Sequence, residues 1–306
     1  MLNSSASTDR LLMVTLSNIG DLVMTTPILA ALHEKYPHAQ IDIVADRRSG
    51  ELLRACPYVG EIIWKTKQSG WREKWRLLRK VRARKYLLTV DLRGPWLAWF
   101  SRSAFRARKA AYKTEMHAVE HHFTAISAIV SAHEIPWACL WLPESAELKA
   151  RQLLAEAVGQ RILALAPGAN WPGKIWPAQK YAALIERVAD KFDLVCLLGG
   201  KDDVSRCEEI AKEAALDCVD LSGRTSLLES AACLAQASYF VGNDSGIGHL
   251  AAALKIPSCT VFGPGEPERY RPWGPSAEII LAPDRDLDKL DADAVAAQVL
   301  EYFNGS

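Results

Sequence analysis

Three short segments of this chain combine glycine with side chains that can carry a charge or a proton. The first, Ser17 to Asp21, directly follows an apolar run at 11–16. In parallel sheets ligands bind at the carboxyl ends of the strands, so Asp21 should face a crevice and could accept a proton there. Capping of the following helix is the structural alternative for this aspartate. The segment lacks the G-x-G-x-x-G fingerprint of a dinucleotide site.

The other two segments suit an anion. Pro167 to Pro177 is a loop rich in glycine and proline with one cation, Lys174, which can neutralise a phosphate or simply be solvated. Gly242 to His249 runs from a strand into a helix whose first residues are small. Free backbone N–H groups and the helix dipole favour a pyrophosphate there. The structural alternatives are N-capping by Asp244 and Ser245 and a packed histidine at His249.

The elements that must position these segments follow from an alternation of β-type and helix-type runs, which predicts parallel sheets with crossover helices. Strands are expected at 11–16, 41–45, 61–64, 87–92 and 109–112, and again at 162–166, 194–198, 218–221, 239–242, 258–262 and 278–281. Helices are expected at 27–35, 71–84, 178–191, 227–237, 250–255 and 292–303. The sequence therefore predicts an α/β chain with two doubly wound, Rossmann-like sheets.

The length of 306 residues also favours two domains. A proline-containing stretch at 133–146 places the boundary and gives domains 1–140 and 141–306. The last helix is a candidate to pack back on the first domain.

Residues 1–10 are polar and predict no signal peptide, and no apolar run reaches the roughly 20 residues of a membrane span. Seven scattered cysteines without a C-x-x-C pair are typical of reduced thiols, so a cytoplasmic location is expected.

The net charge of +1 conceals an asymmetry. Residues 1–150 hold 22 lysines and arginines against 14 acidic residues, and residues 151–306 hold 15 against 22. Between Lys65 and Lys113 there are 16 basic residues and two acidic ones, Glu73 and Asp91. This segment predicts an anionic partner. A nucleic acid is not expected.

One metal-binding pattern is set aside. His117 to His121 fits H-x-x-E-H, a zinc-protease pattern, but no third ligand is evident and the run reads as helix. We therefore expect either a chance match or a surface histidine cluster, and no metal site.

Taken in order, the three segments resemble glycosyltransferase family 9, the heptosyltransferases of lipopolysaccharide core assembly. The resemblance covers nearly the whole chain and is carried by SNIGDLVMTTPILAAL, LAPGANWPGKIWPAQKYAAL and VGNDSGIGHLAAALKIPSCTVFGP. It implies a GT-B fold in which two Rossmann-like domains face a cleft, the first holding the acceptor and the second the donor. It also implies an ADP-heptose donor, with no metal and no bound cofactor.

The resemblance assigns roles as well. The residue matching Asp21 is the family's proposed general base for an inverting transfer. The resemblance implies that the donor is bound by Gly168, Asn170, Lys174, Glu229, Asp244, Ser245, Gly246 and His249. The chain departs from the family at Thr15, where many members carry a basic residue.

The implied acceptor is a lipid-linked anionic oligosaccharide, the lipopolysaccharide inner core, at the cytoplasmic face of the inner membrane. We expect Arg72 and Lys74 to contact it, with a weaker contact from Arg93, and a peripheral attachment through the helix at 71–84. Two alternatives remain: another GT-B nucleotide-sugar enzyme, with a different donor or an epimerase reaction, and a noncatalytic nucleotide- or glycolipid-binding protein. The residues leave open the donor base, the sugar, the accepting residue and the oligomeric state.

Overall fold

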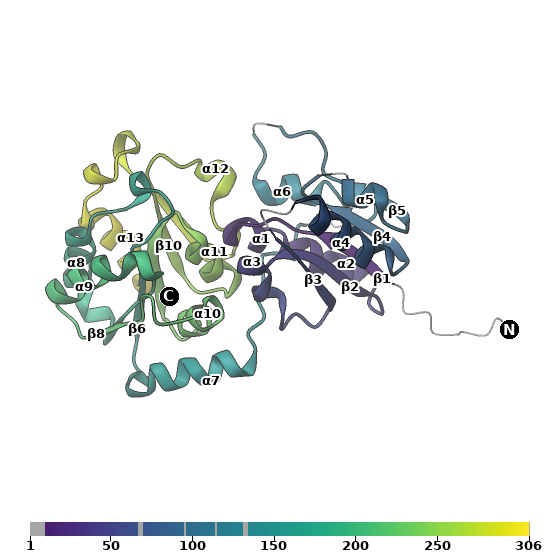
Figure 1. Ribbon diagram of the computed structural model, residues 1–306. Coiled ribbons are helices and arrows are strands. Elements are labelled where there is room, and N and C mark those ends of the chain that lie inside the picture. Colours follow the sequence, from purple (N-terminus) through teal and green to yellow (C-terminus); the bar gives the residue numbers. More distant parts are fainter. Residues whose placement is uncertain (1–9, 67–69, 95, 114, 131–133, 306) are drawn as a thin grey trace. The chain divides into compact units, whose positions relative to one another are not determined.

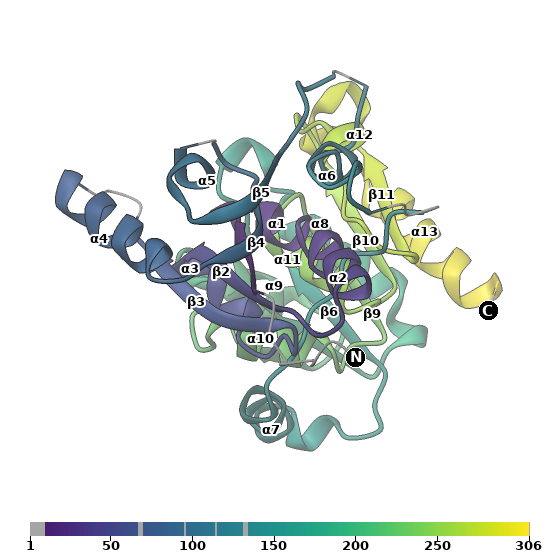
Figure 2. The same cartoon turned by 90° about the vertical axis from the view of Figure 1, so that its right-hand side faces the viewer.

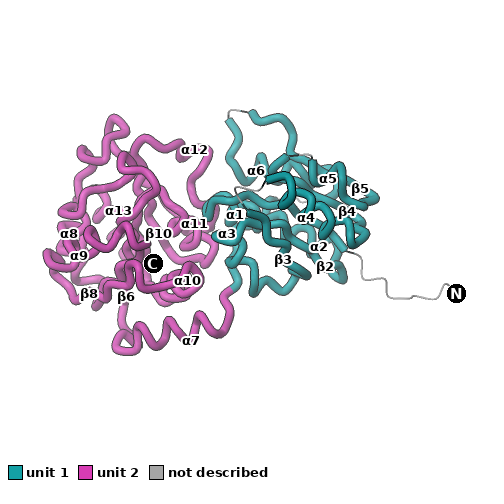
Figure 3. The backbone as a smooth tube through the Cα atoms, viewed as in Figure 1, with its two compact units in different colours: residues 1–141 teal, residues 142–306 magenta. Residues whose placement is uncertain are grey.

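The computed structural model describes residues 10–66, 70–94, 96–113, 115–130 and 134–305. Contacts divide the chain into two compact units, unit 1 at 1–141 and unit 2 at 142–306 (Figure 3). The predicted absence of a signal peptide concerns residues that lie, except for Arg10, outside the described ones. His133, at the start of the predicted break, also lies outside them.

The described residues of unit 1 form a five-stranded parallel sheet in the order β3-β2-β1-β4-β5 (Figure 1). Its strands are β1 (Arg10–Val14), β2 (Gln40–Asp46), β3 (Val59–Lys65), β4 (Tyr86–Asp91) and β5 (Ser103–Arg108). Its helices are α1 (Ile19–Val23), α2 (Thr26–Lys35), α3 (Arg47–Gly50), α4 (Trp71–Arg82), α5 (Trp96–Phe100) and α6 (Ala118–Phe123). The inner strands are nearly continuous apolar runs because both faces of a parallel sheet are covered.

Helices α4 and α5 cover one face of the unit 1 sheet. Val14 of β1, Val44 of β2, Val81 of α4 and Leu97 of α5 belong to one cluster of buried apolar side chains. Figure 2 shows these two helices on one side of the sheet and α2 on the other. Because α4 buries only its apolar stripe, its basic residues remain at the surface.

The strand predicted at 109–112 is wrong. The fifth strand is β5, six residues earlier, and 109–112 has no regular structure. Strand β5 pairs with β4 at the edge of the sheet, and most of its side chains are exposed. An edge strand facing solvent has no apolar run, so the pattern that marked the inner strands is absent from it.

The described residues of unit 2 form a six-stranded parallel sheet in the order β11-β10-β9-β6-β7-β8. Its strands are β6 (Ile162–Ala166), β7 (Leu194–Leu197), β8 (Cys218–Asp220), β9 (Tyr239–Asn243), β10 (Ser258–Phe262) and β11 (Ala277–Leu281). Its helices are α7 (Glu144–Leu153), α8 (Ala178–Arg187), α9 (Val204–Glu213), α10 (Leu227–Leu234), α11 (Gly246–Ala253), α12 (Pro267–Tyr270) and α13 (Ala292–Gly305). The two predicted Rossmann-like sheets are confirmed.

A large apolar cluster in unit 2 contains the buried side chains of Trp176 and Tyr181, which stack edge to face with ring centroids 4.8 Å apart. Val295 and Val299 of the last helix, α13, belong to this core. Three predicted helix bounds shift by three or more residues. Helix α8 ends at Arg187 instead of residue 191, α10 ends at Leu234 instead of residue 237, and α11 begins at Gly246, four residues before the expected start. No described helix is both long and apolar enough to cross a bilayer.

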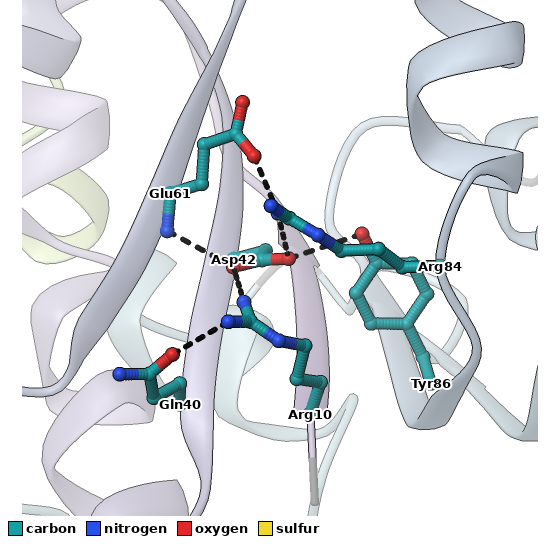
Figure 4. A network of polar contacts seen from close by, with 6 residues as sticks. All are labelled: Arg10, Gln40, Asp42, Glu61, Arg84 and Tyr86. Atoms are coloured by element: carbon teal, nitrogen blue, oxygen red, sulfur yellow. Dashed lines mark hydrogen bonds and ion pairs between the residues drawn. The ribbon is translucent and has the colours of Figure 1, made fainter. Parts of the chain in front are cut away.

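A buried carboxylate joins the strands at the amino-terminal edge of the unit 1 sheet (Figure 4). Asp42 is fully buried on β2, and its carboxylate forms ion pairs with Arg10 Nη1 at 2.7 Å and with Arg84 Nη1 at 2.9 Å. The hydroxyl of Tyr86 donates to the same carboxylate at 3.2 Å, and the backbone N–H of Glu61 donates at 2.9 Å. The network therefore fixes β1, β2, β3 and β4 at the end opposite to the loops that carry the sequence motifs.

Candidate active site

The order of the strands places one crevice in each unit. In unit 1 the chain reverses its direction of winding between β1 and β4, and in unit 2 between β6 and β9. Loops leave the carboxyl ends of two neighbouring strands in opposite directions at such a switch point, and the gap between them is where open α/β sheets bind ligands. The three sequence motifs follow β1, β6 and β9, so each lies at a switch point.

Asp21 lies in the first turn of α1 but does not cap the helix. The N-cap position belongs to Asn18, whose amide donates to Asp21 Oδ2 at 2.8 Å. The capping alternative for Asp21 is therefore wrong, because the carboxylate sits three residues inside the helix. Thr15, where the sequence departs from the resemblance, is fully buried, and its hydroxyl lies 3.1 Å from that of Thr25.

Asn243, at the end of β9, ties the loop after β6 to the unit 2 sheet. Its buried side chain donates to Pro167 O at 2.7 Å and accepts from Trp176 N at 3.1 Å and from Tyr181 Oη at 3.0 Å. Both ends of the loop are thereby fixed. Sequence reasoning did not single out this asparagine, and no short-range signal could have done so, because its partners lie more than 60 residues away.

Lys174 and Asp244 meet across the switch point. Lys174 lies in the 3-10 turn η3 (Pro172–Lys174), and its Nζ is 2.5 Å from Asp244 Oδ2. Asp244 is 9% exposed, and a Cβ on Gly265 would come within 2.6 Å of its carboxylate. The ion pair thus holds the ammonium at the start of α11, where it could meet an anionic ligand.

The start of α11 carries the remaining donors. Ser245 occupies the N-cap position, but its side chain makes no capping bond, and its buried Oγ has no hydrogen-bond partner among the described residues. The capping alternative for Ser245 is therefore wrong for its side chain. The first N–H groups of a helix, here beginning at Gly246, have no intrahelical acceptor and can bind an anion. His249 is buried within the helix.

The other predicted donor residues have varied surroundings. A Cβ on Gly168 would lie 2.3 Å from the carboxylate of Asp203, so packing requires glycine there. Asn170 is exposed in the loop. Glu229 forms a capping box with Ser226, whose backbone N–H donates to it at 2.7 Å and holds the pKa of Glu229 below its ordinary value. Contact of these three with a donor remains a proposal.

The structure brings together two of the three predicted acceptor contacts. Lys74 and Arg93 line one cavity of about 290 Å³ in unit 1, while Arg72 is exposed with its guanidinium 5.6 Å from the Trp71 ring centroid. The same cavity is lined by Lys65 and Asp91, which sequence reasoning named only as charges in a basic segment. Their positions at the carboxyl ends of β3 and β4 were the available signal.

The H-x-x-E-H sequence at 117–121 forms the N-terminus of helix α6. His117 is the N-cap of α6, where its Nδ1 accepts the Val119 N–H at 3.2 Å and Glu120 accepts the His117 N–H at 2.8 Å. This capping box accounts for two of the three polar positions. Among the described residues no group of three or more histidine, cysteine or acidic side chains could hold a metal ion.

Comparison with known proteins identifies the family and the fold. Residues 75–298 match the model of glycosyltransferase family 9 (heptosyltransferase). The chain is 28% identical to lipooligosaccharide heptosyltransferase 2 of Haemophilus ducreyi, over 92% of this chain and 91% of that protein. It superposes on E. coli ADP-heptose lipopolysaccharide heptosyltransferase II with a TM-score of 0.81 at 23% identity, covering 95% and 97% of the two chains. An E. coli heptosyltransferase with ADP gives a TM-score of 0.78 at 22% identity, covering 95% and 99%.

Proposed function

Since the chain belongs to glycosyltransferase family 9, a family of enzymes, we propose that it transfers heptose from ADP-heptose to the inner core of lipopolysaccharide. The proposal rests on the side chains that lie at the two switch points. One offers a carboxylate that caps no helix, and the other offers a cation beside a helix start with an unpartnered hydroxyl. Sugar transfer needs both a base and a site for a departing diphosphate.

In this mechanism Asp21 accepts the proton of the attacking acceptor hydroxyl. The new bond forms between that oxygen and the anomeric carbon of heptose, while the bond from this carbon to the diphosphate oxygen breaks with inversion. The electron pair of the broken bond leaves with ADP. Lys174 and the N–H groups at the start of α11 stabilise the charge that builds on the diphosphate, so no step requires a metal.

The assay that tests the proposal combines ADP-heptose with a heptose-free inner-core lipid and measures both ADP release and the mass of the product. We expect ADP release only when donor and acceptor are both present. An epimerase would alter the donor without the acceptor, and a noncatalytic binding protein would release nothing. Either result contradicts the proposed transfer.

The donor assignment predicts a nucleotide preference. Two proteins of similar fold are an E. coli ADP-heptose heptosyltransferase and an E. coli heptosyltransferase solved with ADP. We therefore expect ADP to bind at least about tenfold more tightly than UDP or GDP, equivalent to about 1.4 kcal/mol. Calorimetric titration of the three nucleotides checks this, and repeating the ADP titration with a chelator should leave the Kd unchanged. A tenfold preference for UDP or GDP contradicts the ADP-heptose assignment but not the fold.

We also propose a peripheral membrane attachment through α4, α5 and β5. Four large aromatic side chains on these elements are at least 64% exposed: Trp71, Trp75, Trp99 and Phe105. Trp71 and Trp75 are four residues apart and share one face of α4. Exposed apolar groups of this size mark interaction surfaces, and tryptophan favours the membrane interface. The basic residues of α4 would attract anionic lipid headgroups.

Replacing Trp71 and Trp99 together by serine should lower binding to vesicles that contain phosphatidylglycerol by about 30-fold, equivalent to about 2 kcal/mol. Each indole that no longer enters the interface forfeits about 1 kcal/mol of apolar burial. Co-sedimentation with vesicles measures the partition. Trp137→Ser is the matched control, because Trp137 is 49% exposed in the same unit but lies outside these three elements. Equal partition of the double variant and the native protein would count against the attachment surface.

A further inference from the structure

The cavity at the switch point of unit 1 is built around a buried cation. It lies where the ends of β1, β2 and β4 stand in register, since Val14 pairs with Val44 on one side and with Asp91 on the other. The two valines, with Leu77 and Leu97, give it an apolar base. Its charged lining consists of Lys65, Lys74, Arg93 and Asp91.

Lys65, the last residue of β3, is the side chain that this cavity leaves unsatisfied. Its Nζ is buried and has no hydrogen-bond partner among the described residues. An ammonium has three donors, and burying them without acceptors is costly. Burial, together with the nearby charge of Arg93, lowers the pKa of Lys65 to about 8. A ligand with oxygen acceptors would satisfy these donors.

Asp91 does not supply those acceptors. Its Oδ1 accepts the backbone N–H groups of Arg93 at 3.0 Å and Gly94 at 2.9 Å, and its Oδ2 accepts that of Ala98 at 3.4 Å. This carboxylate is engaged in holding the turn after β4 and the start of α5. The lining therefore presents three cations against one carboxylate already bound to the backbone, and it attracts an anion.

The other charged groups around Lys65 are paired or directed elsewhere. Asp46, its register partner on β2, accepts the Arg48 N–H as the N-cap of α3. On α4, Glu73 forms an ion pair with Arg76 at 2.6 Å. The surplus positive charge thus stays with the cavity.

The cavity is joined to the loop that carries the candidate base. The guanidinium of Arg93 donates to Ser17 Oγ, and Asn18, the next residue, donates to Asp21. An anion held beside Arg93 would therefore lie next to the loop that presents the Asp21 carboxylate. An acceptor sugar bound by such a group would be held close to this loop.

We propose that this cavity binds one compact oxyanion of the acceptor, a carboxylate or a phosphate monoester, with Lys65 as its buried ligand and Lys74 and Arg93 at its rim. The identity of the anion as part of the acceptor rests on the proposed function. Binding of an oxyanion does not, because it can be measured without donor or acceptor.

Direct binding is tested by titrating the native protein with inorganic phosphate and with acetate, with ADP present to fill the crevice of unit 2. At pH 8 the bound anion should raise the pKa of Lys65, which is about 8, so binding should take up about half a proton. Calorimetry in two buffers of different ionisation enthalpy measures this uptake. Lys65→Met should weaken oxyanion binding at least tenfold and abolish the uptake. Lys65→Arg should retain binding without the uptake.

Lys85→Met is the matched control, since Lys85 is an exposed lysine beside the opposite end of β4. Melting temperatures of all three variants verify that they are folded. Anion binding and proton uptake that are the same in Lys65→Met as in the native protein overturn the site.

The link to the acceptor is tested by steady-state kinetics from pH 7 to 9. In the native enzyme the acceptor KM should rise above about pH 8, because Lys65 loses its proton and its attraction for the anion. In Lys65→Arg the KM should stay level, and in Lys65→Met it should be raised at least tenfold at pH 7 while ADP affinity is unchanged. If phosphate binds through Lys65 but the acceptor KM of Lys65→Met equals that of the native enzyme, the acceptor assignment is overturned while the transfer reaction stands.

Discussion

Asp21→Asn should abolish most of the transfer, lowering kcat by about 10²- to 10⁴-fold, the typical cost of losing a general base. Asparagine has nearly the same size, but its amide cannot accept the proton of the acceptor hydroxyl. The affinity for ADP should be almost unchanged, because Lys174 and the start of α11 belong to the other unit. Initial rates with saturating donor and acceptor, together with ADP calorimetry, check both statements.

Stability should also be preserved in Asp21→Asn. The carboxylate accepts a hydrogen bond from Asn18, and the carbonyl oxygen of an asparagine can accept the same bond. A change in melting temperature of more than a few degrees would point to a structural role. If the variant folds, binds ADP and keeps a normal kcat, the proposed base is the wrong residue.

Lys174→Met should show the opposite pattern to Asp21→Asn, with its main effect on the affinity for ADP. Removing the ammonium deletes the proposed charged contact to the diphosphate and leaves Asp244, 9% exposed, without its partner in the ion pair. Charge-assisted hydrogen bonds contribute about 1.5–3 kcal/mol, so the Kd for ADP should rise roughly 10- to 100-fold. The two variants together separate proton transfer from donor binding.

Asp42→Ala should have the largest effect on stability, lowering the free energy of unfolding by about 3 kcal/mol, the lower end of the cost of breaking a buried ion pair. The substitution removes the shared acceptor of Arg10, Arg84 and Tyr86. The lower end applies because the two arginine side chains are 28% and 37% exposed and can regain water. Urea unfolding of the native protein and the variant measures the difference.

Glu73→Ala is the control for this experiment. Glu73 also pairs with an arginine, but both side chains are at least 41% exposed, and such pairs contribute at most about 1 kcal/mol. Asp42 lies at the edge of the sheet opposite to the crevice, so the folded Asp42→Ala protein should retain its kcat. A loss of stability no greater than that of Glu73→Ala would show that the network stabilises little.

The sequence alone determined the inner strands and the positions of the motifs. Runs such as 162–166 and 258–262 predicted β6 and β10 to the residue, because every position of these strands is buried and most of them carry apolar or β-branched side chains. Asp21, Lys174 and Asp244 were found for a related reason. Each lies in a polar, glycine-containing segment after such a run, and parallel strands present their carboxyl ends to the ligand.

Features that depend on partners distant in the chain were decided only by the tertiary structure. Strand β5 has no apolar run, since its identity depends on pairing with β4 at the edge of the sheet. Asn243 holds residues 167, 176 and 181, and Asp42 binds residues 10, 84 and 86. In the sequence, Lys65 is one of 16 basic residues in its segment. Only the structure shows that its ammonium is buried without a hydrogen-bond partner among the described residues. Local patterns record which face of an element is buried, whereas charge pairing and cavities arise between elements, because they depend on which side chains the fold brings within a few ångströms.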